Sequence, residues 1–90
     1  MNNKITISPN PFTQRLSVEV TSEVNENLIV TLTNSDEDRI IRMFSWHVRP
    51  GANTTSIDGL STFPPGAYCI QIKNDSRTLQ YKEILQKKAL

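Results

Sequence analysis

The segment Leu16-Ser17-Val18-Glu19-Val20-Thr21 decides the fold class, because its apolar and polar residues alternate one by one. Successive side chains of a β-strand point to opposite faces of a sheet, so this alternation predicts a strand with one buried and one wet face. The segment Leu28-Ile29-Val30-Thr31-Leu32-Thr33 repeats the pattern after a polar turn at 25–27. The pattern therefore predicts two half-buried strands in succession, at 16–21 and 28–33.

The same alternation extends outward to both ends of the chain and is broken by turn residues about every 8–12 positions. Further strands are predicted around Ile5 and Ile7 and over residues 39–48, 53–58, 67–73 and 77–86. Nine Ile, five Val and nine Thr support them, because β-branched residues pack well on pleated sheets. About seven strands in one chain predict an all-β, immunoglobulin-like or fibronectin-like antiparallel β-sandwich.

Two of the later strands show which faces the pattern assigns and which it leaves open. The strand over 39–48 has Ile41 and Met43 on one face and Ile40, Phe44, Trp46 and Val48 on the other. Either a β-bulge or burial on both faces accounts for this distribution. In the last strand, Leu79, Tyr81 and Leu85 are expected on one face.

Size and charge exclude several classes of protein. A chain of 90 residues supports a single core. Its net charge of +1 provides no positive field for nucleic acid, and no run approaches the roughly 18 apolar residues of a membrane span. The first eight residues lack the apolar stretch of a secretory signal, so the chain either works in the cytoplasm or is part of a longer exported protein. We expect no cofactor and no structural metal, since Cys69 and His47 fall short of a zinc ligand set.

Few side chains offer chemistry. His47 lies in the middle of a strand, where a structural role is favoured over catalysis. Cys69 alternates with the inward Tyr68 and Ile70, so it either meets a second apolar layer or lies at the surface, and a packed thiol is the default. The run Asp36-Glu37-Asp38 lacks the spacing of a calcium loop and is interpreted as a solvated turn.

The loops contain more information than these isolated side chains. In residues 59–68, an apolar stretch is followed by two prolines, Gly66 and Tyr68. This order is typical of a tyrosine corner, in which the phenol hydroxyl binds a backbone group across the corner, so a structural role is favoured for Tyr68. Lys82, Lys87 and Lys88 either protect an edge strand from pairing with another molecule or form a docking patch.

Four segments, in this order, resemble the C-terminal sorting domain (type A) of the type IX, or Por, secretion system of Bacteroidetes. Ser8-Pro9-Asn10-Pro11-Phe12 is similar to the family's Pro-Asn-Pro-Phe signature, and Gly51-Ala52-Asn53 with Ile57-Asp58 resembles its Gly-x-Asn and Leu-Asp segments. The stretch 63–68 resembles the family's Leu-Pro-x-Gly-x-Tyr, and 81–87 resembles its Lys-rich last strand. The resemblance covers about residues 7–88. Glu83, where a second Lys is common, Ala89-Leu90 beyond the usual end, and the acidic turn at 36–38 depart from the family pattern.

The resemblance implies that the domain is a sorting signal and not an enzyme. A single sorting domain would span residues 1–90, with residues 1–6 as candidates for a linker or for added residues. It would follow a covalently attached N-terminal cargo, be recognised in the periplasm by the outer-membrane translocon, and be removed by a sortase-like peptidase. The cargo would end outside the cell or on its surface.

The resemblance also suggests where binding takes place. We expect the receptor to contact an exposed loop of Pro9, Asn10, Pro11 and Phe12 together with Lys82, Lys87 and Lys88 on the last strand, and we include Gly66 and Tyr68 among the binding candidates. Strand addition at that edge is one mode, and exposed edges would also permit a homodimer. The alternative function is a stand-alone adhesion or carbohydrate-binding module that uses Trp46 and Tyr81.

Overall fold

A computed structural model describes residues 4–89 of the chain. Within this range the chain forms strands joined by turns and loops, and no segment is helical. The strands are β1 (Lys4–Ser8), β2 (Leu16–Ser22), β3 (Glu26–Asn34), β4 (Arg39–Val48), β5 (Gly51–Ile57), β6 (Gly66–Asn74) and β7 (Leu79–Lys87). Each predicted strand is present, and the prediction of an all-β chain is confirmed.

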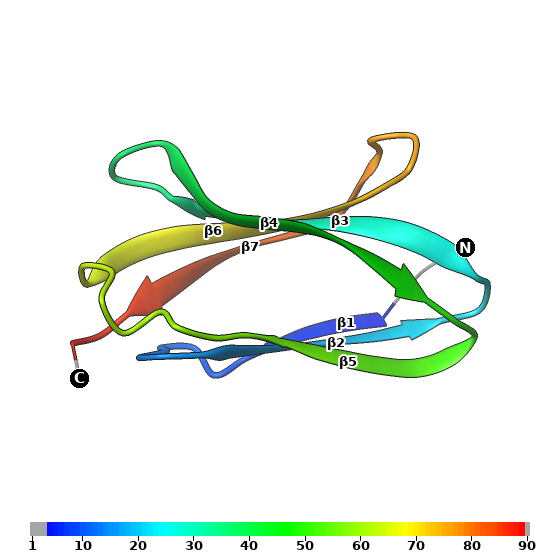
Figure 1. The fold of residues 1–90 in the computed structure, drawn as a ribbon, viewed down its shortest axis with the longest axis horizontal. Helices are drawn as coiled ribbons and strands as arrows, with labels where there is room; N and C mark the ends of the chain where they lie inside the picture. Colours follow the sequence, from blue (N-terminus) through cyan, green and yellow to red (C-terminus); the bar gives the residue numbers. More distant parts are fainter. Residues whose placement is uncertain (1–3, 90) are drawn as a thin grey trace.

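The strands form two antiparallel sheets that face each other as the two layers of a sandwich (Figure 1). One sheet has three strands in the order β1-β2-β5, and the other has four in the order β4-β3-β6-β7. The chain therefore crosses between the layers three times, after β2, β4 and β5. Residues 4–6, which the sequence set apart as linker candidates, lie in β1 and pair with β2, whereas residues 1–3 lie outside the described residues.

The core consists of the alternating apolar side chains that the sequence predicted, pointing inward from both sheets. Val18 and Val20 of β2 are buried, as are Leu28, Val30 and Leu32 of β3. The remaining buried apolar residues of this core are Ile7, Phe12, Leu16, Val48, Ile57, Leu60, Tyr68, Ile70, Ile72 and Leu85. Both sheets contribute side chains to this set. The inner face of each sheet is therefore buried by packing against the other sheet.

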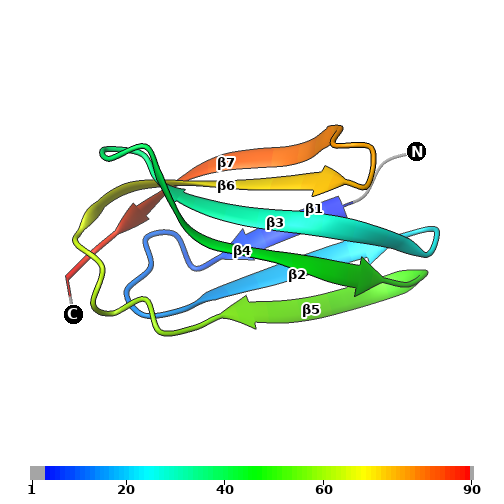
Figure 2. The ribbon, with the colours of Figure 1, turned by 45° about the horizontal axis from the view of Figure 1, so that its top comes forward.

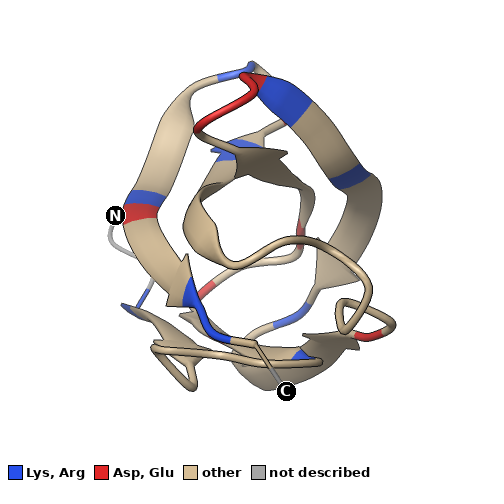
Figure 3. Cartoon of the chain, turned by 90° about the vertical axis from the view of Figure 1, so that its left-hand side faces the viewer, with Lys and Arg blue, Asp and Glu red and all other residues tan. Residues whose placement is uncertain are grey.

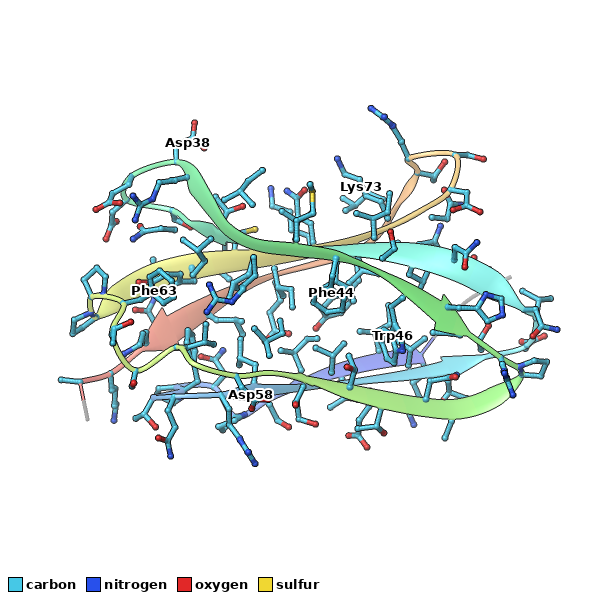
Figure 4. The ribbon with its side chains drawn as sticks, in the orientation of Figure 1. Asp38, Phe44, Trp46, Asp58, Phe63 and Lys73 are labelled. Carbon is cyan, nitrogen blue, oxygen red and sulfur yellow. The ribbon has the colours of Figure 1, made fainter. Side chains whose placement is uncertain are left out.

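Two β-bulges decide the faces that the alternation left open or assigned wrongly. In β4, Leu32 pairs with Arg42 and Thr33 pairs with Ile40, so Ile41 is the extra residue. The bulge turns Ile41 toward the core and leaves Ile40 56% exposed, which reverses the sides predicted for these two residues. Beyond the bulge, Phe44, Trp46 and Val48 share one face, as predicted, and this face is the inner one. Figure 4 shows Phe44 and Trp46 pointing into the space between the sheets.

The second bulge lies near the start of β7. Ile72 pairs with Tyr81 but Lys73 pairs with Leu79, so Gln80 is the extra residue. Leu79 was predicted on the same face as Tyr81 and Leu85, and this prediction is wrong: Leu79 is 48% exposed on the outer face. A period-two pattern cannot show where an extra residue enters a strand.

Candidate functional site

The candidate site is the junction between the segment Pro9–Phe12 and the end of β7. We call this junction the seam. The Phe12 amide donates to the Gln86 carbonyl at 2.9 Å, and the Lys88 amide donates to the Phe12 carbonyl at 2.9 Å. These bonds make a parallel bridge between Phe12 and Lys87. The seam therefore covers part of the β7 edge with a segment from near the beginning of the chain. Figure 3 views the molecule from this end, with the C-terminus toward the viewer.

Asn10 adds a side-chain bond to the seam. Its Oδ1 atom accepts a hydrogen bond from the Gln86 amide at 3.0 Å. The flanking Pro9 and Pro11 have no N–H to donate, and the peptide bonds that precede both prolines are cis. The main-chain N–H and C=O of Gln86 are thus both bound by this segment.

Phe12 and Tyr68 anchor the seam to the core. Their rings meet edge to face with centroids 5.7 Å apart, and each side chain is only 1% exposed. The Tyr68 hydroxyl donates to the Pro64 carbonyl at 2.6 Å, which confirms the predicted tyrosine corner. Burial raises the pKa of the Tyr68 phenol, and the nearby carboxylates of Glu37 and Asp36 raise it further.

Gly66 begins β6 opposite Lys87, the residue that the seam bridges to Phe12. Its φ of +146° is a backbone conformation that residues with a Cβ rarely adopt. A Cβ at this position would lie 2.8 Å from an Asp36 carboxylate oxygen. Glycine at 66 therefore allows β6 to start close to the turn that follows β3.

The predicted basic patch is only partly at the surface. Lys88 and Lys82 are exposed, but Lys87 is 4% exposed, and its Nζ donates to the Lys88 carbonyl at 3.2 Å. Lys87 lies two residues after the buried Leu85, so the strand alternation turns it inward. Lys82 pairs with Gln71 nearer the start of the edge strand β7, away from the seam at its other end.

The predicted exposed loop also needs a correction. Pro9, Asn10 and Pro11 are exposed, whereas Phe12 fills the end of the core. The structure therefore brings the residues Asn10, Phe12, Gly66, Tyr68, Lys87 and Lys88 together at one end and leaves Lys82 apart.

Asn53 has a structural role that the sequence did not reveal. Its side chain accepts from the Arg49 amide at 3.0 Å and donates to the carbonyls of Arg49, Gly51 and Val20. It therefore fixes the turn between β4 and β5 and ties it to β2. The Gly51-Ala52-Asn53 spacing was the available signal, because a short amide two residues after a turn glycine can bind the turn's own backbone.

The residues with candidate chemistry have structural surroundings. His47 Nδ1 lies 2.8 Å from Asn27 Oδ1, and Cys69 is a buried free thiol, as its default packing role predicts. Among residues 4–89, no three His, Cys, Asp or Glu side chains are grouped to hold a metal ion. Trp46 and Tyr81, the aromatic residues of the alternative binding module, pack half-buried against the core.

The sequence of the chain matches a family model, the secretion system C-terminal sorting domain, over residues 6–86. The chain belongs to this family. The sorting domain of type IX secretion is not an enzyme family, and its members direct proteins to the extracellular space or the cell surface. No part of residues 4–89 forms a helix long and apolar enough to cross a membrane. No curated protein sequence matches this chain.

Solved structures share the fold at low sequence identity. The sensor domain of the anti-sigma factor RsgI4 from Pseudobacteroides cellulosolvens superposes with a TM-score of 0.59 at 13% identity, covering 100% of this chain and 98% of that one. A beta-glucosidase from Kluyveromyces marxianus matches with a TM-score of 0.56 at 18% identity. That match covers 97% of the sorting domain but only 14% of the glucosidase chain. At these identities the likeness concerns the fold alone.

Proposed function

We propose that the outer-membrane translocon of the type IX system recognises this sorting domain at the seam. The domain, which we take to span residues 1–90, follows an N-terminal cargo that passes through the periplasm. One observation carries the proposal: Phe12 binds the backbone of both Gln86 and Lys88, and Asn10 reaches Gln86 across 76 positions of sequence. A receptor that contacts the seam therefore detects a folded domain and not a linear peptide.

The seam presents a compact set of exposed groups to such a receptor. Pro9 and Pro11 are rigid and exposed, and they flank the Asn10 side chain. Lys88 adds a positive charge next to Phe12. Rim charges of this kind mainly change the rate of encounter and the choice of partner.

A reporter export assay tests the proposal. Residues 1–90 are fused behind a Sec signal and a reporter. Export is measured in a host that has the type IX system and in a matched strain without the translocon. Lys88→Glu reverses an exposed charge at the seam and leaves its main-chain bonds in place. We expect this variant to lose most of its export.

Lys4→Glu is the matched control, because Lys4 is also exposed but pairs with Thr21 in the other sheet, outside the seam. It is expected to be exported at the wild-type level. Equal export of the Lys88→Glu variant and the wild type would contradict recognition at the seam. Export of the wild type by the strain without the translocon would contradict the proposed function as a whole.

A second part of the proposal concerns removal of the domain by a sortase-like peptidase. All five residues of β1 pair with β2, and Ile5 and Ile7 pack on the core, so the backbone there is not free to enter the active site of a peptidase. We expect the cut on the N-terminal side of Lys4. Mass spectrometry of the released cargo and of the freed domain locates the bond, and a cut within Lys4–Ser8 would refute this expectation.

A further inference from the structure

The outer faces of the two sheets differ in polarity. On the three-stranded sheet, the outward positions alternate with the buried ones and are polar apart from one alanine. These residues are Lys4, Thr6, Ser8, Ser17, Glu19, Thr21, Ala52, Thr54 and Ser56. A solvent-exposed sheet face ordinarily has this composition. The polarity of the outer face of the four-stranded sheet can therefore be compared with it.

The outer face of the four-stranded sheet carries large apolar side chains instead. Ile40 and Met43 of β4 are 56% and 64% exposed, and Leu79 and Ile84 of β7 are 48% and 52% exposed. The register places Ile40, Thr33, Cys69 and Ile84 side by side across all four strands. Figure 2 turns this face, which we call the apolar face, toward the viewer. Four large exposed apolar side chains on one outer face of a small domain favour a contact with another molecule.

The apolar face is also hollow. The turns between β3 and β4 and between β6 and β7 rise above the sheet at its two ends (Figure 1). Asp38 from the first turn and Arg77 from the second line the same hollow of about 830 Å³, together with Ile29, Ile40 and Met43. The hollow therefore lies between two walls, and on its floor the apolar Ile29, Ile40 and Met43 alternate with polar side chains. These are Thr31, Thr33, Ser45 and Gln71.

Backbone hydrogen bonding restricts what can lie on this floor. The central strands β3 and β6 each pair on both sides, so they offer no free backbone groups to a segment above them. An extended strand laid on the face would leave its own N–H and C=O groups unpaired. An α-helix satisfies these groups internally, and a helix packed on a sheet face is a common layer arrangement.

Charge narrows the choice of helix. Lys73 and Arg77 line the hollow, Lys82 stands exposed on the same face, and Asp38 is the acidic side chain among the lining residues. Figure 4 shows Asp38 and Lys73 on the outer side of this sheet. The excess of positive charge favours a partner with carboxylates beside its apolar stripe.

From these observations we propose that the apolar face is the docking site for an amphipathic α-helix of a partner protein, a helix with an apolar stripe flanked by acidic residues. This inference deepens the proposed function, and only its cellular test rests on that function. The helix and the translocon contact at the seam would occupy different surfaces. The sorting domain would then offer two sites of different chemistry.

A pair of synthetic helical peptides tests the docking site in solution. Both peptides carry the same Leu stripe, and the stripe is flanked by Glu in one and by Lys in the other. Amide shifts of the 90-residue protein are followed by NMR during each titration. We expect the Glu peptide to shift residues around Ile29, Ile40 and Ile84, to bind more weakly as salt rises, and to bind roughly tenfold more tightly than the Lys peptide.

Two variants, one on each outer face, test which face binds the peptide. Met43→Glu places a carboxylate on the apolar face at an exposed position, and we expect it to weaken the Glu peptide roughly tenfold or more because like charges then meet. Thr21→Glu is the control on the polar face, where Thr21 is exposed and opposite Lys4. It is expected to bind like the wild type. Thermal unfolding checks that both variants are folded.

Four results would overturn the inference. These are no binding, equal binding of the two peptides, peptide shifts confined to the three-stranded sheet, or shifts of the apolar face that depend on protein concentration without peptide. The last result would assign the face to a second copy of the chain. In cells, export of the Met43→Glu fusion at the wild-type level would defeat the docking site alone, whereas failure of the wild-type fusion to be exported would defeat the proposed function first.

Discussion

Gly66 shows how a single residue without a side chain permits the tight end of the sandwich. Its φ of +146° and the φ of +103° at Gly51 both lie in the range that residues with a Cβ rarely adopt, and at Gly51 a Cβ would meet nothing within 4 Å. At Gly66 the same atom would lie 2.8 Å from the end of the flexible Asp36 side chain, which can move away. The backbone conformation, and not the contact, should therefore dominate the cost of adding a Cβ.

Gly66→Ala is expected to lower the free energy of unfolding by about 1–3 kcal/mol, the usual cost of holding a residue in a strained backbone conformation. Gly51→Ala is the matched variant and should lose a similar amount. Urea unfolding followed by tryptophan fluorescence measures both. A loss at Gly66 several times that at Gly51 would show that Asp36 cannot move.

The phenol of Tyr81 should make the free energy of unfolding decrease as the pH rises in the alkaline range. Burial, with smaller contributions from the hydrogen bond to Glu83 and from the charge of that carboxylate, raises its pKa from the ordinary 10.0 to about 12. The folded state then holds a proton that the unfolded state releases. This contribution to stability is complete below the unfolded pKa and is lost as the pH rises through about 12.

Tyr81→Phe should therefore flatten the decline of stability between about pH 9 and pH 12. Urea midpoints across this range, for the variant and the wild type, provide the measurement. Burial also raises the pKa of Tyr68, so part of the decline should remain in the variant. An unchanged slope in the variant would contradict the role of Tyr81.

At the scale of elements, the sequence predicted the strands well and their irregularities poorly. Alternation identified each of the seven strands, because half-buried strands need one apolar face. The bulges at Ile41 and Gln80 were not located, since each depends on a partner strand that the local pattern does not contain. The apolar outer face follows from these two positions, which place Ile40 and Leu79 outside.

Asn53 determines the geometry of the turn in which the chain crosses from β4 in one sheet to β5 in the other. Asn53→Ala removes an acceptor and a donor from a half-buried turn, and we expect a loss of about 1–3 kcal/mol. Asn53→Asp keeps the acceptor for the Arg49 amide but loses the bonds to the Arg49 and Gly51 carbonyls. Chemical denaturation should place Asp between Asn and Ala, and equal stability of all three proteins would exclude this role.

For the whole molecule, the tyrosine corner was predictable but the seam was not. The Pro-Pro-Gly-Ala-Tyr order at 64–68 signals the corner locally. No local pattern indicates that Phe12 pairs with the far end of the chain, and its flanking residues are typical of an exposed loop. The positions of Phe12 and Lys87 inside the end of the core follow only from the assembled sandwich.

Deletion of residues 81–90 should unfold the domain. It removes the buried Leu85, most of the pairing of β6 with β7, and every bond of the seam. Loss of one buried Leu side chain costs about 2–5 kcal/mol, a large part of the roughly 5–15 kcal/mol that stabilises a small domain. Circular dichroism and NMR of the truncated protein should show loss of the folded state, and a cooperative thermal transition like that of the wild type would contradict this expectation.

The pairing of Phe12 with residues 86 and 88 also has a consequence for synthesis. A nonsense mutation or a stalled ribosome can end the polypeptide after residue 12 but before residue 86. Such a chain contains Phe12 but lacks the backbone groups of residues 86 and 88 that bind it. Such an incomplete product contains the Pro-Asn-Pro-Phe sequence but not the folded seam to which that sequence contributes. Export that depends on this shape would reject unfinished chains before they leave the cell.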